Sequence, residues 1–323
     1  MKYGNINYVD KKVSHIFYGT AMNPFMTGEG GEELFDSIYS LGVNAFDTAR
    51  DYGLAEKALG TWIEKRGLRE EVVILSKCGH PDKTTWRKRI NDVEIREDLA
   101  TSLSYLKTDY IDIYLMHRDD TDVPVGKIAE IFNALIDEGK IKSYGGSNWS
   151  YERVKEINAY ANDHGLVPMT VSSPHFGLAE QVRDLWGGGC LTITGKSNAN
   201  ARDFYKENQM PIIAYSSLGR GFMSGRVKFY NIDKISDVLD EFAIKGYTSP
   251  ENYERLRRCE LLAEEKNVNV SQLAMAWLYN QPQNVYAIVS TSSAERMKSN
   301  IEAMDIKLTD EESKYLNLEI DKL

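Results

Sequence analysis

The stretch GVNAFDTARDYG, residues 42–53, sets the pattern for the whole chain. Its apolar half ends where Asp47 begins a polar segment, and Tyr52 follows five residues later. Two later apolar runs end in the same way, VVILSK in Lys77 and IDIYLMH in His117. Polar side chains thus stand at the ends of three successive candidate strands. In a barrel of parallel strands these ends meet on one face, where active sites are built.

Strand-like and helix-like segments alternate from one end of the chain to the other. The strand-like segments are residues 14–20, 43–46, 72–77, 111–117, 141–148, 168–173, 211–217 and 285–290. The helix-like segments are residues 32–41, 54–65, 87–106, 126–138, 151–163, 199–207, 250–266, 271–280 and 294–304. Most strand-like segments are apolar on both faces, which is typical of a buried parallel sheet. We therefore predict the α/β class and a single right-handed (β/α)8 TIM barrel domain over residues 1–323. Residues 5–13 are expected to form a short hairpin at its N-terminal end.

Helix boundaries carry recognisable capping residues. Ser150 and Ser271 precede helix-like segments and are expected to be N-caps. Thr309 opens TDEE, which has the spacing of a capping box. Gly139 follows ALIDE and suits the left-handed position just beyond a helix end.

Composition excludes several classes of protein. The chain has 323 residues, is 42% hydrophobic and carries a net charge of −9, with no basic patch of the kind that nucleic-acid binders show. No apolar run is long enough to span a membrane, and the first residues lack the apolar core of a signal peptide. We therefore expect a cytoplasmic protein with no nucleic-acid or membrane partner. The three cysteines have neither disulfide nor metal-ligand spacing, and the five histidines form no HxH pair, which argues against a metal-dependent hydrolase.

Two long connections interrupt the regular alternation. Residues 177–199 contain WGGGC, and residues 217–249 contain LGRGFMSGRVKFY. Both follow strand-like segments, so both belong on the face where active sites are built. Long loops in compact domains are usually functional, and we interpret these two as a substrate-pocket wall and a cofactor clamp. The alternative is that they are tolerated insertions. The role of the glycine-rich Trp186–Cys190 segment stays open.

The residues at the first three strand ends suit proton transfer to a carbonyl. An ammonium beside a phenol stabilises the phenolate, so we expect Lys77 to lower the pKa of Tyr52. Asp47 is placed to hold Lys77, and His117 to donate a hydrogen bond to the carbonyl oxygen on which negative charge develops. The chemistry indicated is that of a reductase. The alternatives are a Lys77 side chain that reaches for solvent and a His117 that satisfies a hydrogen bond in the core.

Six motifs in order carry a resemblance to a known family. They are FDTARDYG at 46–53, ILSKCG at 74–79, IYLMHRDD at 113–120, GKIKSYGGSNW at 139–149, IIAYSSLGRG at 212–221 and IVSTSSAERMKSN at 288–300. In this order they resemble the aldo-keto reductase superfamily, in its bacterial type, over nearly the whole chain. The resemblance implies reduction of an aldehyde or ketone to an alcohol, or the reverse reaction. It implies Tyr52 as general acid, His117 as the residue that orients the substrate, and Lys77 with Asp47 as the supporting ion pair.

Hydride must come from a cofactor, because no side chain supplies one. No GxGxxG motif follows an N-terminal strand, so a Rossmann site is not expected. The resemblance implies that Ser147 and Asn148 hold the carboxamide of a nicotinamide dinucleotide and that Tyr215 stacks on its ring. Ser173 stands where the family usually has Gln. The alternative for Tyr215 is an aromatic side chain at the edge of the core.

The resemblance also implies a site for the phosphates. Ser216, Leu218 and Gly219 would begin the pyrophosphate loop, and Arg220 is placed to pair with a phosphate. Ser290 and Thr291 lead into the last long helix-like segment, whose N-terminus favours an anion. The further residues implied there are Arg296, on the 2′-phosphate of NADP, and Asn300, near the adenine.

The cofactor expected is NADPH/NADP, with NADH as the alternative. An Arg in the first turn of a helix opposes the helix dipole unless an anion pairs with it, which favours a 2′-phosphate near Arg296. Ser290 stands where many members of the family have Lys, which weakens that preference. The competing interpretation of Arg296 is an ordinary surface residue.

The candidate substrate-pocket residues mix aromatic and polar side chains. They are Met22, Phe25, Arg50, His80, Trp86, Arg118, His175, Trp186 and Phe222. This mixture favours a polar or sugar-like small carbonyl substrate, and the alternative is that Arg50 and Arg118 pair with neighbouring acids. A rival function is a nucleotide-binding regulatory subunit of the same fold with little turnover. We expect a monomer or a small homo-oligomer and no metal site.

Overall fold

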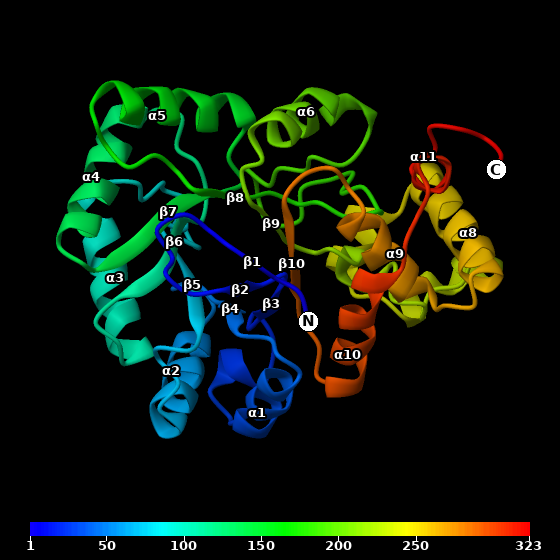
Figure 1. Ribbon diagram of the computed structural model, residues 1–323, viewed down its shortest axis with the longest axis horizontal. Coiled ribbons are helices and arrows are strands. Elements are labelled where there is room, and N and C mark those ends of the chain that lie inside the picture. The colour runs from blue at the N-terminus through cyan, green and yellow to red at the C-terminus, as the bar shows by residue number, and fades with distance from the viewer. The chain divides into compact units, whose positions relative to one another are not determined.

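A computed structural model describes all residues, 1–323, and Figure 1 shows its elements in chain order. The strands are β1 (Tyr3–Gly4), β2 (Val13–Ser14), β3 (Ile16–Gly19), β4 (Ala45–Asp47), β5 (Val73–Cys78), β6 (Ile111–Met116), β7 (Ile141–Ser147), β8 (Val171–Ser173), β9 (Ile212–Ala214) and β10 (Val285–Val289). Eight of them form a closed parallel barrel in the order β10-β3-β4-β5-β6-β7-β8-β9. The α/β barrel predicted from the alternation is therefore confirmed.

Helices alternate with the strands, as the sequence predicts. The α-helices are α1 (Glu32–Ser40), α2 (Ala55–Arg66), α3 (Asp92–Leu106), α4 (Val125–Asp137), α5 (Tyr151–Asp163), α6 (Ala199–Asn208), α7 (Glu241–Tyr247), α8 (Pro250–Glu265), α9 (Val270–Tyr279), α10 (Ala294–Glu302) and α11 (Asp310–Leu316). Short 3-10 helices are η1 (Phe25–Thr27), η2 (Lys196–Asn198), η3 (Gly219–Gly221), η4 (Phe229–Asp237) and η5 (Ala303–Asp305). None of the helices is long and apolar enough to cross a membrane.

The chain packs as two compact units. One consists of residues 2–173 with 290–294, and the other of residue 1, residues 174–289 and residues 295–323. The first contains β1 to β8 and helices α1 to α5, and Figure 1 shows these helices along the outside of strands β3 to β8. The second contains β9, β10 and the helices from α6 onward, except for the first residue of α10. The single domain over residues 1–323 stays a prediction.

Strand register in the first unit brings the polar strand ends to one level. Asp47 at the end of β4 pairs with Leu75 of β5, and Lys77 of β5 pairs with Leu115 of β6. Ser147 at the end of β7 pairs with Ser173 at the end of β8. Because the strands are parallel, their carboxyl ends lie at the same end of the sheet. The polar residues at and just after these strand ends therefore lie at that end.

Packing of α1 and α2 against the first strands is largely aromatic. Phe35 of α1 stacks on Phe25 with ring centroids 4.2 Å apart and lies 5.2 Å from Trp62 of α2. Trp62 in turn lies 5.1 Å from Phe46 of β4, and all four rings are buried. Burial of an aromatic side chain contributes about 2 kcal/mol or more. This cluster therefore fixes the strand that ends in Asp47.

The N-terminal hairpin is confirmed. Strands β1 and β2 pair antiparallel, with Tyr3 opposite Ser14. Lys11, in the connection between them, donates to the buried carboxylate of Asp112 at 2.8 Å and to the carbonyl oxygen of Val72 at 2.8 Å. The hairpin is thus tied to the starts of β5 and β6.

Two helix starts differ from the sequence prediction. Helix α3 begins at Asp92 rather than Arg87, because the Asn91 side chain accepts the Glu94 N–H and caps it there. Helix α9 is capped by Asn269 in a capping box with Gln272, whereas Ser271 lies inside the helix and donates to the Asn269 side chain. Ser271 as N-cap was therefore a wrong prediction.

The other capping predictions are confirmed. Ser150 accepts the Arg153 N–H at the start of α5. Thr309 and Glu312 form the capping box of α11. Gly139 has a φ of +70°, in the left-handed region just beyond α4.

Candidate active site

Asp47, Lys77 and Tyr52 lie together at the ends of β4 and β5. The Lys77 ammonium group binds the Asp47 carboxylate and donates to the Thr48 carbonyl oxygen at 3.0 Å. It also donates to the Tyr52 hydroxyl oxygen at 3.4 Å. Lys77 is 3% exposed and Asp47 2%, so this ion pair is shielded from water. Because Lys77 donates to Tyr52, the phenol keeps its own hydrogen for another acceptor.

His117, directly after β6, completes this group. Its ring meets the Tyr52 ring edge to face, with centroids 5.5 Å apart. The imidazole is buried, and its Nδ1 atom has no hydrogen-bond partner. Since no acceptor lies near Nδ1, we assign the proton of the neutral ring to Nε2. All four residues that the sequence singled out at strand ends are therefore brought together.

The pKa of Tyr52 differs in direction from the sequence expectation. Burial raises the pKa of this phenol, while the Lys77 ammonium acts in the opposite direction and does not outweigh it. The expected lowering is therefore wrong, because a sequence shows the neighbouring charge and not the loss of water. The consequence is a Tyr52 that stays protonated at neutral pH, as a proton donor must.

In the Lys77–Asp47 ion pair, burial and the charge of the partner also shift each pKa in opposite directions. Burial alone would lower the pKa of Lys77, but the Asp47 carboxylate and Tyr52 raise it, and the net direction is upward. Burial raises the pKa of Asp47, and Lys77 opposes that rise. Lys77 therefore holds its positive charge beside the phenol oxygen across the neutral range.

His117 is neutral in this setting. Burial is the largest cause that lowers its pKa well below the ordinary value, and the positive charges of Lys77 and Arg118 add to it. A neutral imidazole with its proton on Nε2 donates one hydrogen bond. Tyr52 and His117 thus each have one hydrogen to donate at neutral pH.

Arg50, a candidate substrate-pocket residue, has close partners within the protein. It forms an ion pair with Glu56 at 2.6 Å, and its guanidinium lies over the Tyr105 ring at 4.7 Å. Glu56 is fully buried and also accepts the Ser76 hydroxyl at 2.6 Å. This agrees with the alternative in which the arginine pairs with a neighbouring acid. Arg50 and Glu56 together clamp the segment that carries Tyr52 between β5 and α2.

The residues expected to hold a carboxamide lie at the ends of β7 and β8. The Asn148 amide donates to the Ser147 hydroxyl at 3.1 Å and to the His117 carbonyl oxygen at 3.3 Å. Ser147 donates to the Ser173 carbonyl oxygen at 3.0 Å. Asn148 has a φ of +62°, so its backbone is held in the left-handed region. These three residues form one connected polar group that begins beside His117.

Ser290 and Thr291 belong to the first compact unit, which also contains Asp47, Tyr52, Lys77 and His117. The Ser290 hydroxyl donates to the Gly19 carbonyl oxygen at 3.0 Å, and the Thr291 carbonyl oxygen accepts the Tyr18 hydroxyl at 2.8 Å. Both contacts fix the segment to the end of β3.

The other unit contains the remaining aromatic candidates. The His175 ring lies 5.8 Å from Tyr215 and 5.6 Å from Tyr247, and Trp186 lies 6.1 Å from Tyr215. His175 is fully buried, its Nδ1 is 2.8 Å from the Thr192 hydroxyl, and its Nε2 has no hydrogen-bond partner. Tyr215 directly follows β9, and the structure thus groups it with two further candidates, His175 and Trp186.

The turn from Ser216 to Gly221 directly follows Tyr215 and contains several left-handed residues. Ser216, Gly219, Arg220 and Gly221 all have positive φ, while Leu218 at −105° precedes Gly219 at +58°. Within the turn, the Gly219 N–H donates to the Ser216 carbonyl oxygen at 2.7 Å and the Gly221 N–H to the Leu218 carbonyl oxygen at 3.1 Å. The Arg220 side chain pairs with Asp240 at 2.8 Å and lies between the Trp186 and Phe242 rings.

The last candidates lie on α10. Arg296 is exposed in its first turn, and Asn300 is buried one turn later.

Two further candidates lie in the first unit, beside His117. Arg118 is buried and donates to the His117 carbonyl oxygen at 2.9 Å. His80 lies 4.9 Å from the His117 ring and 6.3 Å from Trp86.

Several residues of the site escape sequence reasoning. Glu56 follows Tyr52 by four residues. A carboxylate in the first turn of a helix is usually solvent-exposed and stabilised by the helix dipole, so the sequence does not indicate that Glu56 is buried and paired with Arg50. Asp51, Arg89 and Asp98 were also overlooked, although Asp51 lies inside the FDTARDYG motif. No group of three or more His, Cys, Asp or Glu is arranged to hold a metal ion.

A parallel barrel with a tyrosine, lysine, aspartate and histidine gathered at its strand ends is the arrangement of a carbonyl oxidoreductase. The model of the aldo/keto reductase family matches residues 15–319, and the chain belongs to that family. It is an enzyme of the aldo-keto reductase type.

Relatives among known proteins extend over most of the chain. Aldo-keto reductase str7 of Strobilurus tenacellus is 25% identical over 308 residues, covering 92% of this chain and 81% of that protein. The aldo-keto reductase yakc of Schizosaccharomyces pombe, with NADP(+) in its name, is 24% identical over 310 residues and covers 92% and 82%. A probable voltage-gated potassium channel subunit beta of Oryza sativa subsp. japonica is 27% identical over 320 residues and covers 95% and 92%.

Proposed function

We propose that this protein is an NADPH-dependent reductase of a small polar or sugar-like carbonyl compound, with Tyr52 as the general acid. The same groups serve the reverse reaction, oxidation of an alcohol. The observation that carries the proposal is the Tyr52 hydroxyl, which accepts from Lys77 at 3.4 Å and lies beside the neutral His117. We propose the cytoplasm as its location and a monomer or small homo-oligomer as its state.

The residues present suit a nicotinamide dinucleotide. The left-handed turn at residues 216–221 carries Arg220, whose guanidinium suits a phosphate. Ser147 and Asn148 offer a hydroxyl and an amide beside His117. Arg296 is exposed on α10, and its guanidinium suits a 2′-phosphate. We therefore propose Ser147, Asn148, Ser173, Tyr215 and the 216–220 turn, with Ser290, Thr291, Arg296 and Asn300, as cofactor-binding residues.

When bound, the nicotinamide supplies the hydride that no side chain supplies. The chain's own residues manage the proton. Tyr52 and His117 donate hydrogen bonds to the carbonyl oxygen, where negative charge develops as the carbonyl carbon is reduced. The Tyr52 proton passes to that oxygen, and Lys77 stabilises the phenolate that remains.

Cofactor choice is tested by fluorescence titration with NADPH and NADH, on the wild type and on Arg296→Ala. Bound nucleotide is expected to quench tryptophan emission. NADPH should bind more tightly, and Arg296→Ala should remove that preference, since the paired 2′-phosphate is the one group that distinguishes the two nucleotides. Equal affinities in both proteins would show that Arg296 is a surface residue, and no binding of either nucleotide would overturn the reductase proposal.

The second candidate function is a nucleotide-binding subunit with little turnover. The observation in its favour is the similarity to the Oryza sativa protein, whose name is that of a channel subunit. The discriminating result is the turnover rate of a chain that binds NADPH. A rate that Tyr52→Phe does not change would favour this candidate over the reductase.

A further inference from the structure

We infer that His80 and Asp51 together recognise a hydroxyl group on the carbon next to the reacting carbonyl. This inference rests on the proposed reductase function and names the substrate class within it. The substrates selected are α-hydroxy aldehydes and ketones, compounds in which one hydroxyl hydrogen can be donated close to the carbonyl oxygen.

His80 is placed beside the residue that meets the carbonyl. Its ring lies against the His117 ring in an edge-to-face contact, with centroids 4.9 Å apart. The oxygens of an α-hydroxy carbonyl compound are roughly 3 Å apart, which is close to the length of one hydrogen bond. A substrate whose carbonyl oxygen is held by His117 therefore brings its adjacent hydroxyl within reach of His80.

The hydrogen-bonding role of His80 is fixed by its backbone neighbour. Its Nδ1 lies 2.8 Å from the Pro81 carbonyl oxygen, and because a carbonyl oxygen only accepts, Nδ1 carries the proton. Burial lowers the pKa of His80, although Asp51 acts in the opposite direction, and Arg118 and Lys83 add to the lowering. The ring is therefore neutral at pH 7, and its Nε2 is an acceptor.

Asp51 presents a second acceptor next to the first. Its Oδ2 atom lies 3.8 Å from His80 Nε2, too far for a hydrogen bond. Its other oxygen pairs with the Lys83 ammonium at 3.0 Å. With His80 neutral, His80 Nε2 and Asp51 Oδ2 are both acceptors, and neither has a hydrogen to donate to the other. A substrate hydroxyl would supply the hydrogen that both atoms lack.

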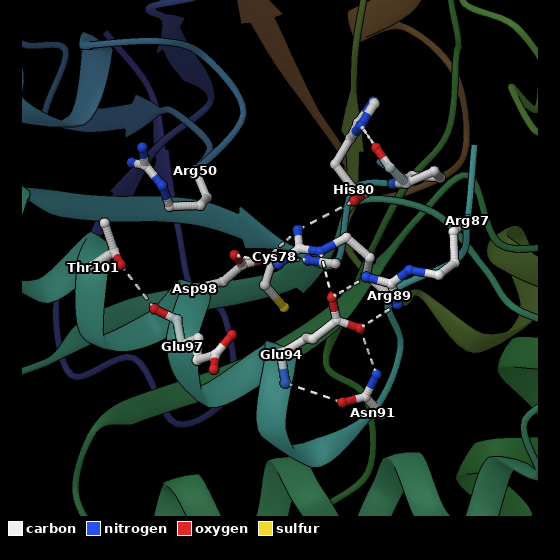
Figure 2. Close-up of polar contacts among 12 residues, drawn as sticks. Arg50, Cys78, His80, Arg87, Arg89, Asn91, Glu94, Glu97, Asp98 and Thr101 are labelled. Carbon is white, nitrogen blue, oxygen red and sulfur yellow. Dashed lines mark hydrogen bonds and ion pairs between the residues drawn. The ribbon is translucent and has the colours of Figure 1, made fainter. Parts of the chain in front are cut away.

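The segment that carries His80 is anchored to helix α3, as Figure 2 shows. Arg89 donates to the His80 carbonyl oxygen at 3.3 Å and pairs with the buried carboxylate of Asp98 at 2.9 Å. Arg89 and Arg87 both bind Glu94, at 2.9 and 2.7 Å. Asp98 also accepts the Gly79 N–H at 2.9 Å. His80 is thus held by a rigid support rather than by a free loop, as a specificity residue needs to be.

An apolar group in the same place would offer no hydrogen to either acceptor. Sites of this kind discriminate strongly against substrates that lack the hydrogen-bonding group, whereas purely apolar pockets discriminate weakly. We therefore expect kcat/KM to favour the hydroxylated member of an isosteric pair by about tenfold or more.

The test compares glycolaldehyde with propanal, and hydroxyacetone with butanone, with NADPH as reductant. Each pair exchanges a hydroxyl for a methyl group of similar size. The wild type should favour the hydroxylated compound in both pairs by about tenfold or more. His80→Phe keeps the ring contact with His117 and removes the acceptor, so the ratio should fall to about one. His80→Gln restores an acceptor oxygen and should recover part of the ratio.

Arg87→Ala is the matched control. Arg87 lies on the same loop and is largely exposed, and Arg89 still anchors the loop, so the ratio should remain that of the wild type. Asp51→Asn gives a second, independent variant, expected to lower the ratio. A wild type that reduces both members of each pair equally well overturns the inference and leaves the reductase proposal standing. If the chain binds NADPH but reduces no carbonyl compound, both the inference and the reductase proposal are overturned.

Discussion

At the scale of single residues, the balance between burial and charge decides what each group does. Tyr52 keeps its proton because burial outweighs the effect of Lys77, and His117 loses its charge because burial and two cations act in the same direction. Both residues therefore carry a hydrogen to donate at neutral pH, as the proposed carbonyl reduction requires. Neither result follows from the identity of the residues alone.

The neutral state of His117 has a consequence for the pH profile. An ordinary histidine has a pKa of about 6.5 and would lose half of its neutral form there. Since the pKa of His117 is well below this value, kcat for carbonyl reduction should stay level from pH 8 down to pH 6. The measurement is NADPH oxidation at saturating substrate across that range. A decline centred near pH 6.5 would show that His117 titrates normally.

Arg50 should affect turnover rather than substrate binding. Arg50→Met leaves the fully buried Glu56 carboxylate with only the Ser76 hydroxyl, which destabilises the fold by about 2 kcal/mol and loosens the Tyr52 segment. We expect kcat to fall by about tenfold with KM changed by less than threefold. Steady-state kinetics with chemical denaturation check both effects. A large rise in KM with unchanged kcat would place Arg50 in the substrate pocket instead.

At the scale of elements, capping residues decide where helices begin. The sequence offers Asn269 and Ser271 two residues apart, and only the structure shows that Asn269 and Gln272 exchange both capping hydrogen bonds. Asn269→Ala should lower the free energy of unfolding by about 1 kcal/mol. Ser271→Ala, the matched control inside the first turn, should change it by less than about 0.5 kcal/mol. Urea denaturation of both variants is the measurement, and a larger loss for Ser271→Ala would reverse the assignment.

The strand ends could be predicted from the sequence, whereas one helix start and one buried ion pair could not. Strand ends were predictable because apolar runs stop where ionisable residues begin, and parallel pairing then forces Asp47, Lys77 and His117 to one side. The start of α3 was missed because Arg87, Lys88 and Arg89 suit a helix by composition, whereas they bind Glu94, Asp98 and Asp120 from a loop. The Arg50–Glu56 pair was missed because its partners are joined by tertiary packing rather than by a motif.

At the scale of the whole molecule, buried histidines make stability depend on pH. Burial lowers the pKa of His175 to about 3. An unfolded chain binds a proton at this side chain below about pH 6.5, and the folded one does not, so stability is full above pH 6.5 and is lost as pH falls toward 3. Between pH 7 and pH 5 this one group should remove about 2 kcal/mol of unfolding free energy.

The variant His175→Gln isolates that contribution. Its unfolding free energy should fall by about 2 kcal/mol less than that of the wild type between pH 7 and pH 5, since glutamine does not titrate. Urea denaturation at the two pH values measures the difference. Equal losses in the two proteins would show that His175 is protonated in the folded state as readily as in the unfolded one.

The role of Tyr52 as proton donor is tested by NADPH-dependent carbonyl reduction with Tyr52→Phe beside the wild type. The phenylalanine keeps the ring against His117 and removes only the hydroxyl that accepts from Lys77. We predict that kcat falls by at least about 100-fold while the affinity for NADPH, followed by fluorescence, stays within about threefold. Turnover that survives the substitution would contradict the assignment of Tyr52 as the proton donor.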